Sequence, residues 1–446
     1  MKEFNKIIGY SKEKAELEQI ADIIRNRKAY DDLGVRPPCG LLMYGEPGLG
    51  KTLMAKCLIE ACGIPVYTCR KDEPNGKFVD TIKKTFEVAA ENAPAIVFLD
   101  DVDKFANTGY SQRDAEEFVA VQACIDANKE TGIFVLATAN DIDKLPASLR
   151  RAGRFDRIME ISPPNVKDAV GIINHYLSEK KFVADVDTKL LAKIMCGRSC
   201  AQLETVINEA GIYAGRERAK SINMDHILRA CVKTVFSTAI GGRPQINIGM
   251  LDDDDDDDYD FASVKNQSSP RKEIVACHEI GHTIVSEVLF PGSVTIVALT
   301  EGGAGEGFTS CYWEETCDVA WIKSRAITSL GGMAATEQIY GIEDLGNVAD
   351  LHKAFSTIDS MVTRGCMWGL GYKNYGYTAS QARKQKTEEL VGAIVEKYNR
   401  KAKEIIAKNR EFFDKLLKAL LEKGMLVEGE IAEIRKTCKI TPVAID

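Results

Sequence analysis

The chain has 446 residues and a formal net charge of -8, with 45% hydrophobic and 28% charged residues. This length predicts two or three domains, and the composition is that of a globular protein, which excludes a disordered or fibrous chain. The negative charge argues against general nucleic-acid binding, because a polyanion is repelled unless a local basic stripe exists, and Lys and Arg are spread along the whole sequence. We therefore expect no nucleic-acid partner.

The start of the chain, MKEFNKIIGYSKEKAEL, lacks the apolar core of a secretory signal, and the 13 cysteines are scattered and odd in number. We therefore expect reduced thiols and a cytoplasmic location. The longest apolar stretches, at 95–99 and 133–139, fall far short of the roughly 20 residues needed to span a bilayer. No intrinsic membrane span is expected.

Helical patterns alternate with short apolar runs over residues 1–163. The runs are CGLLMYG, IPVYTC, AIVFLD, GIFVLATAN and RIMEIS. This alternation predicts an α/β domain, with a parallel sheet flanked by helices. The pattern over 164–240 is helical throughout and predicts a helical lid subdomain.

Residues 241–269 differ from the rest of the chain, since they include seven consecutive aspartates at 252–258 followed by a polar stretch. Like charges repel, so the segment is interpreted as an extended acidic linker. Binding of a cation or a basic partner is the alternative. After the linker, residues 270–446 are predicted to form a mainly helical domain.

The octet GEPGLGKT fits the phosphate-binding pattern G-x-x-x-x-G-K-[ST] and lies between an apolar run and a helical pattern, as that motif requires. Backbone N–H groups of such a loop surround phosphates, its lysine adds positive charge, and its threonine ligates Mg²⁺. The predicted ATP-binding residues here are Gly45, Glu46, Pro47, Gly48, Leu49, Gly50, Lys51 and Thr52.

Two later apolar runs end in polar residues. The run IVFLDD ends in Asp100, which is suited to the Mg²⁺ shell, and Asp101, which is suited to polarising the attacking water. Asn140 ends VLATAND and is expected near the γ-phosphate or that water. The spacing of these residues after the phosphate loop favours an ATP hydrolase.

The segment SLRRAGRFDR groups its arginines around a glycine, an arrangement that favours contact with an anion. The order of motifs resembles the AAA+ ATPases, and this segment is similar to their second region of homology. The resemblance implies that Arg151 and Arg154 are arginine fingers that reach a neighbouring subunit, in a homo-hexamer. It also implies that IIGY at 7–10 lies over adenine, that His175 lies near the base, and that 208–216 belongs to the lid.

The pentapeptide HEIGH lies in a segment whose apolar residues recur at helical spacing after Pro270. His278 and His282 are therefore one turn apart on one face, where two imidazoles can bind one Zn²⁺. Glu279, beside the first histidine, can accept a proton from the metal-bound water. This is the arrangement of a metallopeptidase.

A catalytic zinc needs a third protein ligand. The pattern H-E-x-x-H-x-x-G-x-x-H does not supply it, because Val285 and Val288 stand where its Gly and His belong. The residue types leave several candidates open, namely Glu337, Asp344, Asp350, Asp359 and the neighbouring His352.

From about residue 270 the sequence resembles the FtsH family of AAA+ zinc proteases. HEIGHTIV, SLGGMAATEQIYG at 329–341 and LGNVADLHKA carry the resemblance. It implies that Asp350 is the third ligand and that Glu337 orients a zinc histidine. The function implied is ATP-driven unfolding of polypeptide substrates and their cleavage at a zinc endopeptidase site, with ATP, Mg²⁺ and Zn²⁺ as cofactors.

Three features depart from that family. Its N-terminal membrane spans have no counterpart in this sequence, Asp101 stands where the family generally has Glu, and 71–84 replaces its pore segment. Phe78 is the candidate substrate-gripping side chain in the replaced segment. Two alternative functions stay open, namely an ATP-driven unfoldase or regulatory module with a weak or inactive peptidase, and a zinc peptidase that does not depend on ATP.

Overall fold

The structure is a computed structural model, and it describes residues 1–71, 78–106, 115–182, 185–236, 270–300, 306–313, 318–342, 348–363 and 381–445. It contains two compact units, Met1–Thr234 and Val235–Asp446. The aspartate run lies outside the described residues, so its role as a linker stays a prediction.

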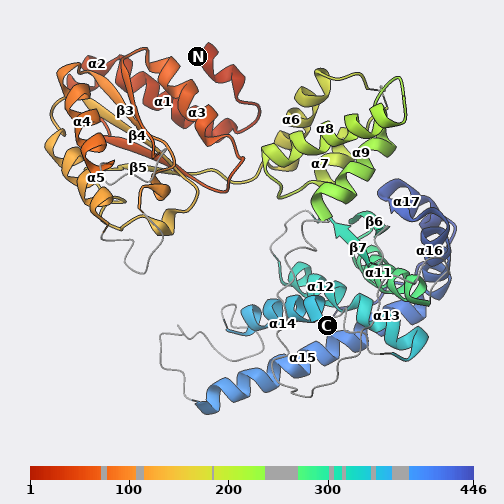
Figure 1. Cartoon of the computed structure of the whole chain (residues 1–446). Coiled ribbons are helices and arrows are strands. Elements are labelled where there is room, and N and C mark those ends of the chain that lie inside the picture. The colour runs from red at the N-terminus through yellow and green to blue at the C-terminus, as the bar shows by residue number, and fades with distance from the viewer. Residues whose placement is uncertain are drawn as a thin grey trace, which may run out of the picture. The chain divides into compact units, whose positions relative to one another are not determined.

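A five-stranded parallel sheet forms the centre of the first unit (Figure 1). Its strands are β1 (Gly40–Tyr44), β2 (Val66–Cys69), β3 (Ala95–Leu99), β4 (Ile133–Ala139) and β5 (Arg157–Glu160), in the spatial order β2-β3-β4-β1-β5. β3 and β4 are buried along nearly their whole length, which is why their sequences are continuous apolar runs. The predicted α/β fold with a parallel sheet is confirmed.

Helices cover both faces of this sheet. Figure 1 shows α1 (Ser11–Arg25) and α3 (Lys51–Cys62) on one face and α4 (Phe78–Glu91) and α5 (Glu116–Ala127) on the other. The short elements are η1 (Lys2–Lys6), α2 (Arg27–Asp31), η2 (Val102–Lys104) and η4 (Ile142–Lys144). Because parallel strands end at one edge, the loops after β1, β3 and β4 meet there.

A helical subdomain completes the first unit. It contains α6 (Val166–Ser178), α7 (Thr188–Ile194), α8 (Cys200–Arg216), α9 (Met224–Cys231) and the π-helical turn η5 (Val232–Phe236). Capping boxes fix where two of these helices begin, since Ser199 and Gln202 form one at α8 and Asn223 and His226 form one at α9.

The second unit is mainly helical, as predicted, and also holds a small antiparallel sheet. Its helices are α11 (Pro270–Leu289), α12 (Val319–Ser329), α13 (Gly331–Tyr340), α14 (Val348–Thr363), α15 (Gln381–Lys408), α16 (Arg410–Lys423) and α17 (Glu428–Lys436). The strands β6 (Val294–Thr300), β7 (Glu306–Cys311) and β8 (Met425–Val427) pair in the order β7-β6-β8.

The core of the second unit surrounds α11. Its buried apolar side chains include Ile280, Ile284 and Val285, which pack in one cluster with residues of α12 to α17. Gly281 faces Gly331 of α13 so closely that a Cβ on Gly281 would lie 2.2 Å from the Gly331 carbonyl oxygen. The two helices therefore touch through their backbones, which places α13 beside the histidines of α11.

Candidate metal centre and nucleotide site

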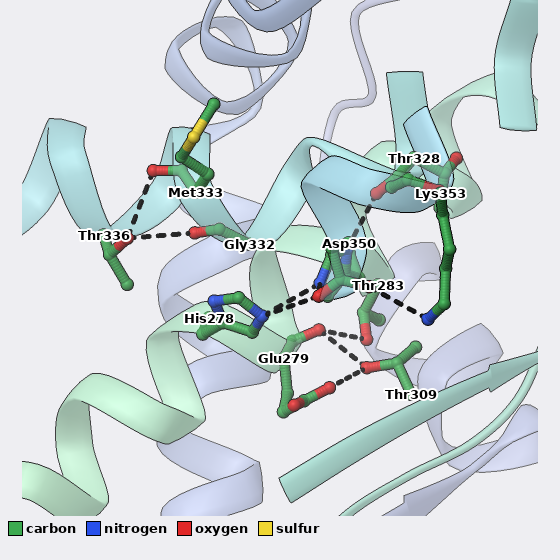
Figure 2. Close-up of polar contacts among 12 residues, drawn as sticks. His278, Glu279, Thr283, Thr309, Thr328, Gly332, Met333, Thr336, Asp350 and Lys353 are labelled. Carbon is green, nitrogen blue, oxygen red and sulfur yellow. Dashed lines mark hydrogen bonds and ion pairs between the residues drawn. The ribbon is translucent and has the colours of Figure 1, made fainter. Parts of the chain in front are cut away.

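Two helices bring His278, His282 and Asp350 together in the second unit. Figure 2 shows His278 and Asp350 next to each other. The histidines lie four residues apart on α11, and Asp350 lies in the first turn of α14. His278 Nε2 and His282 Nε2 are 3.0 Å apart, and Asp350 Oδ2 lies 3.3 and 3.2 Å from them. Three atoms that commonly ligate metals thus converge on one point.

Hydrogen bonds orient two of these side chains. His282 Nδ1 donates to the carbonyl oxygen of Thr328, 2.7 Å away, which leaves the lone pair of Nε2 for a metal. Lys353 Nζ donates to Asp350 Oδ1 at 3.1 Å, so Oδ2 is the carboxylate oxygen that faces the histidines. Gly332 leaves room for His278, since a Cβ at this position would lie 2.5 Å from its Nε2.

The side chains depend electrostatically on one another. Burial lowers the pKa of His282, but the Asp350 carboxylate, Glu279 and the Thr328 carbonyl raise it in sum to about 9. Burial raises the pKa of Asp350, but His282 and His278 outweigh this effect and hold it well below its usual range. The charged carboxylate is thus stabilised by the groups around it, a part that a divalent metal can also take.

The donor set fits zinc. Two nitrogen ligands and one carboxylate oxygen are a common catalytic zinc set, and ligands of a tetrahedral ion with bonds of about 2.0–2.1 Å lie about 3.3 Å apart. The separations of 3.0, 3.2 and 3.3 Å between Nε2, Nε2 and Oδ2 match this spacing. Both histidines are buried, and the Asp350 side chain is 21% exposed, so the centre is reachable from outside.

Glu279 lies beside this centre and is 7% exposed. Its Oε2 accepts a hydrogen bond from Thr309 Oγ1 of β7 at 2.7 Å, as Figure 2 shows. Its backbone carbonyl accepts from Thr283 Oγ1 at 2.9 Å. A buried carboxylate held next to a metal centre is suited to general-base chemistry.

The other acids named as possible ligands lie elsewhere. Glu337 pairs with Lys403 Nζ at 2.5 Å and accepts from Asn399 Nδ2 at 3.5 Å. No hydrogen bond joins Glu337 to His278 or His282 among the described residues, so its role in orienting a zinc histidine stays a prediction. Nδ1 of His278 has no hydrogen-bond partner among the described residues.

Asp359 and His352 are exposed on α14 and do not join the group of three ligand atoms. Asp344 lies outside the described residues. Of the candidates that the sequence left open, the structure brings only Asp350 to the histidines within the described part of the chain.

The phosphate loop connects β1 to α3 in the first unit. Gly45, Gly48 and Gly50 have φ values of 151°, 81° and 91°, and a Cβ at Gly45 would lie 2.1 Å from the Ile161 carbonyl oxygen. Only glycine adopts this path without strain. Glu46, Pro47 and Leu49 complete the loop, whose N–H groups precede the N-terminus of α3.

Lys51 is buried at the start of α3. Its Nζ donates to the carbonyl oxygens of Gly45 and Glu46 at 2.7 and 2.8 Å and to Asn140 Oδ1 at 3.0 Å. Burial lowers its pKa. The amine thus lies at the strand edge between the phosphate loop and Asn140.

The acids after β3 lie at the same edge. Asp100 Oδ1 accepts from Thr138 Oγ1 at 2.7 Å and from Thr52 Oγ1 at 3.4 Å. Asp101 has a positive φ of 54°, and its carboxylate accepts from Lys104 Nζ at 2.7 Å and from Asn140 Nδ2 at 3.3 Å. The structure thus brings the phosphate-loop residues, both acids and Asn140 into one network.

A cavity of about 300 Å³ lies next to the phosphate loop. It is lined by the N-terminal segment around Ile7 and Ile8, by residues 48–50 of the phosphate loop, by Leu53 and Met54 of α3, and by His175 and Tyr176 of α6. The adenine segment and the base-proximal histidine named from the sequence are therefore in one cavity, contributed by both halves of the first unit.

The two candidate arginine fingers differ in their contacts. Arg154 binds Asp126 of α5 through two nitrogens, at 2.6 and 3.3 Å, and also donates to Gln122 at 2.8 Å and to the Ser148 carbonyl at 2.7 Å. Arg151 is exposed and donates to the same carbonyl at 3.3 Å. Neither bonds to the phosphate loop among the described residues.

Phe78, the candidate substrate-gripping residue, is 5% exposed. Its ring contacts Phe105 with a centroid distance of 4.8 Å, and Lys71 Nζ lies 5.7 Å from its centroid. It belongs to the apolar core between the sheet and α4 and α5, so the expectation that it grips substrate is wrong for this conformation. The preceding residues 72–77 lie outside the described part of the chain.

Sequence reasoning did not identify Thr309, Thr328 or Asp126 as contacts of site residues. The short run VTIVALT at 294–300, rich in apolar and β-branched residues, carried a strand signal for β6, but nothing local indicated which residue of the following strand faces Glu279. No helix among the described residues meets the length and hydropathy needed to cross a bilayer.

Comparison with known families matches two parts of the chain. Residues 41–163 match the family described as ATPase family associated with various cellular activities (AAA). Residues 265–434 match peptidase family M41. The first match holds the phosphate loop and the arginine segment, and the second holds HEIGH and Asp350.

The chain is also similar to curated proteins over nearly its whole length. It is 30% identical to the ATP-dependent zinc metalloprotease FtsH of Mycoplasma genitalium and to that of Mycoplasma pneumoniae, and each alignment covers 98% of this chain and 63% of the relative. The FtsH of Caldicellulosiruptor bescii is 28% identical, with 97% and 71% covered. The chain thus spans less than two thirds of the length of the two Mycoplasma relatives, at 63%.

Proposed function

We propose that the chain, which matches the AAA ATPase family over residues 41–163 and peptidase family M41 over residues 265–434, is an ATP-dependent zinc metalloprotease. The convergence of His278, His282 and Asp350 beside Glu279 carries this proposal. These residues give the chain three protein ligands for zinc, and the same chain also holds a phosphate loop.

In the proposed peptidase reaction, His278, His282 and Asp350 hold the metal. Zn²⁺ bound there supplies a Lewis acid that polarises the peptide carbonyl and makes water acidic. Glu279 accepts the proton of the attacking water and delivers it to the amine that leaves. Thr328 keeps His282 in the tautomer that ligates.

In the proposed ATPase reaction, Lys51 leaves its carbonyl partners and contacts the β- and γ-phosphates. Thr52 and Asp100 hold Mg²⁺, which neutralises charge on the phosphates. Asp101 and Asn140 position the attacking water, and His175 lies near the adenine. Because the Asp101 carboxylate is about one methylene shorter than the family's glutamate, we expect hydrolysis to be slow.

We further propose that the chain works as a homo-hexamer in the cytoplasm on polypeptide substrates. The match of the segment with Arg151 and Arg154 to the AAA family supports assembly, because arginines aimed at a neighbour's phosphates would complete its site. None of the eleven cysteines among the described residues forms a disulfide, in keeping with a reducing compartment. The domain limits proposed are 1–163, 164–240, 241–269 and 270–446.

The test is degradation of a folded and an unfolded protein substrate by the purified chain. We expect cleavage of the folded substrate to require ATP, to stop with a zinc chelator and to be absent in Glu279→Gln, with ATP hydrolysis retained in that variant. Equal substrate loss in all samples contradicts a zinc peptidase. ATP hydrolysis without any cleavage would instead support the unfoldase or regulatory module.

A zinc peptidase that does not depend on ATP is the second candidate, and the burial of Phe78 favours it, because the expected substrate-gripping residue does not reach solvent. Lys51→Ala distinguishes the two. Loss of folded-substrate cleavage in this variant, with short-peptide cleavage retained, supports coupling to ATP. Undiminished cleavage of the folded substrate supports the second candidate.

A further inference from the structure

Glu279 is held by a strand that the HEIGH motif does not include. Thr309 Oγ1 of β7 lies 2.7 Å from Glu279 Oε2 and 3.0 Å from its backbone carbonyl oxygen. Figure 2 shows Thr309 reaching the glutamate from the strand side, across from His278. The two residues are 30 positions apart in the sequence, so this contact arises only through packing of β7 on α11.

Gly307 shapes the same face of β7. It lies two residues before Thr309, and alternate residues of a strand share a face. A Cβ on Gly307 would lie 2.7 Å from Glu279 Cγ and 2.9 Å from Val275 Cγ1. Gly307 thus leaves room for the Glu279 side chain, and Thr309, the next residue on the same face of the strand, donates a hydrogen bond to its carboxylate.

The register of the small sheet fixes both positions. Thr309 lies opposite Val297 of β6, and Gly307 lies opposite Leu299 of β6. On its other side, Val297 pairs with β8, and Leu299 bonds to the turn that precedes β8. A slip of one residue would turn Thr309 away from Glu279. The position of the hydroxyl is therefore set by the fold.

We propose that Thr309 is a positioning residue for Glu279 in the proposed peptidase reaction. A threonine hydroxyl has one hydrogen, and when it is donated to Oε2 the second carboxylate oxygen stays available for the attacking water. The hydroxyl also limits rotation of a side chain that must stay within about 3 Å of the water whose proton it accepts. This role rests on the proposed function and names a residue outside the zinc motif.

The variants are Thr309→Val, which removes the donor at similar volume, and Thr309→Ser, which keeps it. Thr283→Val is the matched control, because Thr283 donates to the Glu279 carbonyl and not to its carboxylate. The full chain is assayed with a short unstructured peptide, so that cleavage does not depend on unfolding. Zinc content is measured on every sample.

For Thr309→Val we expect kcat to fall by about 10- to 100-fold with KM within about twofold, since a displaced catalytic group loses about this much. Thr309→Ser and Thr283→Val should stay within about threefold of the unaltered chain. Zinc content should be unchanged throughout.

A second readout is binding of a peptide hydroxamate, whose proton the glutamate accepts when the inhibitor ligates zinc. Calorimetry should show weaker binding in Thr309→Val and normal binding in Thr309→Ser. Unchanged kcat and hydroxamate affinity in Thr309→Val would overturn the proposal, as would a loss of zinc. So would an equal loss of hydroxamate affinity when Thr309→Val is added to Glu279→Gln, because Thr309 is proposed to act through the glutamate. If the unaltered chain binds zinc but cleaves no peptide, the proposed function fails, and hydroxamate affinity still decides the role of Thr309.

Discussion

The two candidate sites differ in how much of their chemistry one chain contains. At the metal centre, His278, His282 and Asp350 are already in contact, and Glu279 lies beside them within the same unit. At the nucleotide site, Arg151 and Arg154 bond to groups of their own segment and of α5. This difference indicates that the proposed zinc site is assembled within one chain, whereas the proposed ATP site is expected to need a residue of a neighbouring chain.

The largest expected effect is on ATP hydrolysis, and it tests whether this reaction needs a neighbouring subunit. Arg151→Ala should lower ATP hydrolysis by about a thousandfold, the usual scale for an arginine finger, and leave short-peptide cleavage unchanged. Arg150→Ala is the matched control, because Arg150 pairs on the surface with Asp143 at 3.6 Å. Phosphate release and peptide cleavage are measured on the same samples.

A mixing experiment sharpens this test. Arg151→Ala subunits keep their phosphate loop, and Lys51→Ala subunits keep their arginines, so a mixture should regain part of the ATPase activity that each lacks alone. No recovery, with mixed assemblies demonstrated, would contradict action between subunits.

The next largest expected effect is on zinc binding, and it tests whether one chain supplies all three protein ligands. Asp350→Ala should weaken zinc binding by at least about a hundredfold and abolish cleavage, because it removes one of three ligands and leaves two buried histidines without their carboxylate. Asp359→Ala, on the same helix and exposed, is the control. Metal analysis after dialysis measures the loss. Full zinc content in Asp350→Ala would place the third ligand elsewhere.

A stability measurement decides the role of Phe78. Phe78→Ala should destabilise the first unit by about 3–5 kcal/mol, since it empties a buried aromatic site between Phe105 and α5. Val119→Ala, 55% exposed on α5, should have little effect. Thermal unfolding provides the comparison. Unchanged stability together with lost substrate processing would return Phe78 to a substrate-gripping role.

The smallest effect concerns the turn between α11 and β6. Glu287 is 2% exposed and accepts from the backbone N–H groups of Gly292 and Val294, both at 3.0 Å. Glu287→Ala should cost about 1–3 kcal/mol in the second unit, because two N–H groups lose their acceptor. Glu422→Ala, on the exposed side of α16, is the control, and denaturant unfolding measures the difference. A normal midpoint would show that water replaces the carboxylate.

Motifs of consecutive residues were predictable because local geometry fixes them. The glycines and Lys51 of the phosphate loop follow one another between a strand and a helix, and the HEIGH histidines are one helical turn apart. The parallel sheet was predictable too, because each strand is a buried apolar run followed by a helix. Periodicity and turn chemistry act over a few residues, which is the range that a sequence shows directly.

Contacts between distant residues required the tertiary structure. Asp350 lies 72 positions from His278, and residue types alone could not separate it from Glu337, whose carboxylate instead binds Lys403. The sequence also could not indicate that Phe78 enters the core or that Thr309 meets Glu279. These outcomes depend on which helix and strand faces pack together, and that choice is made by the whole core rather than by any single segment.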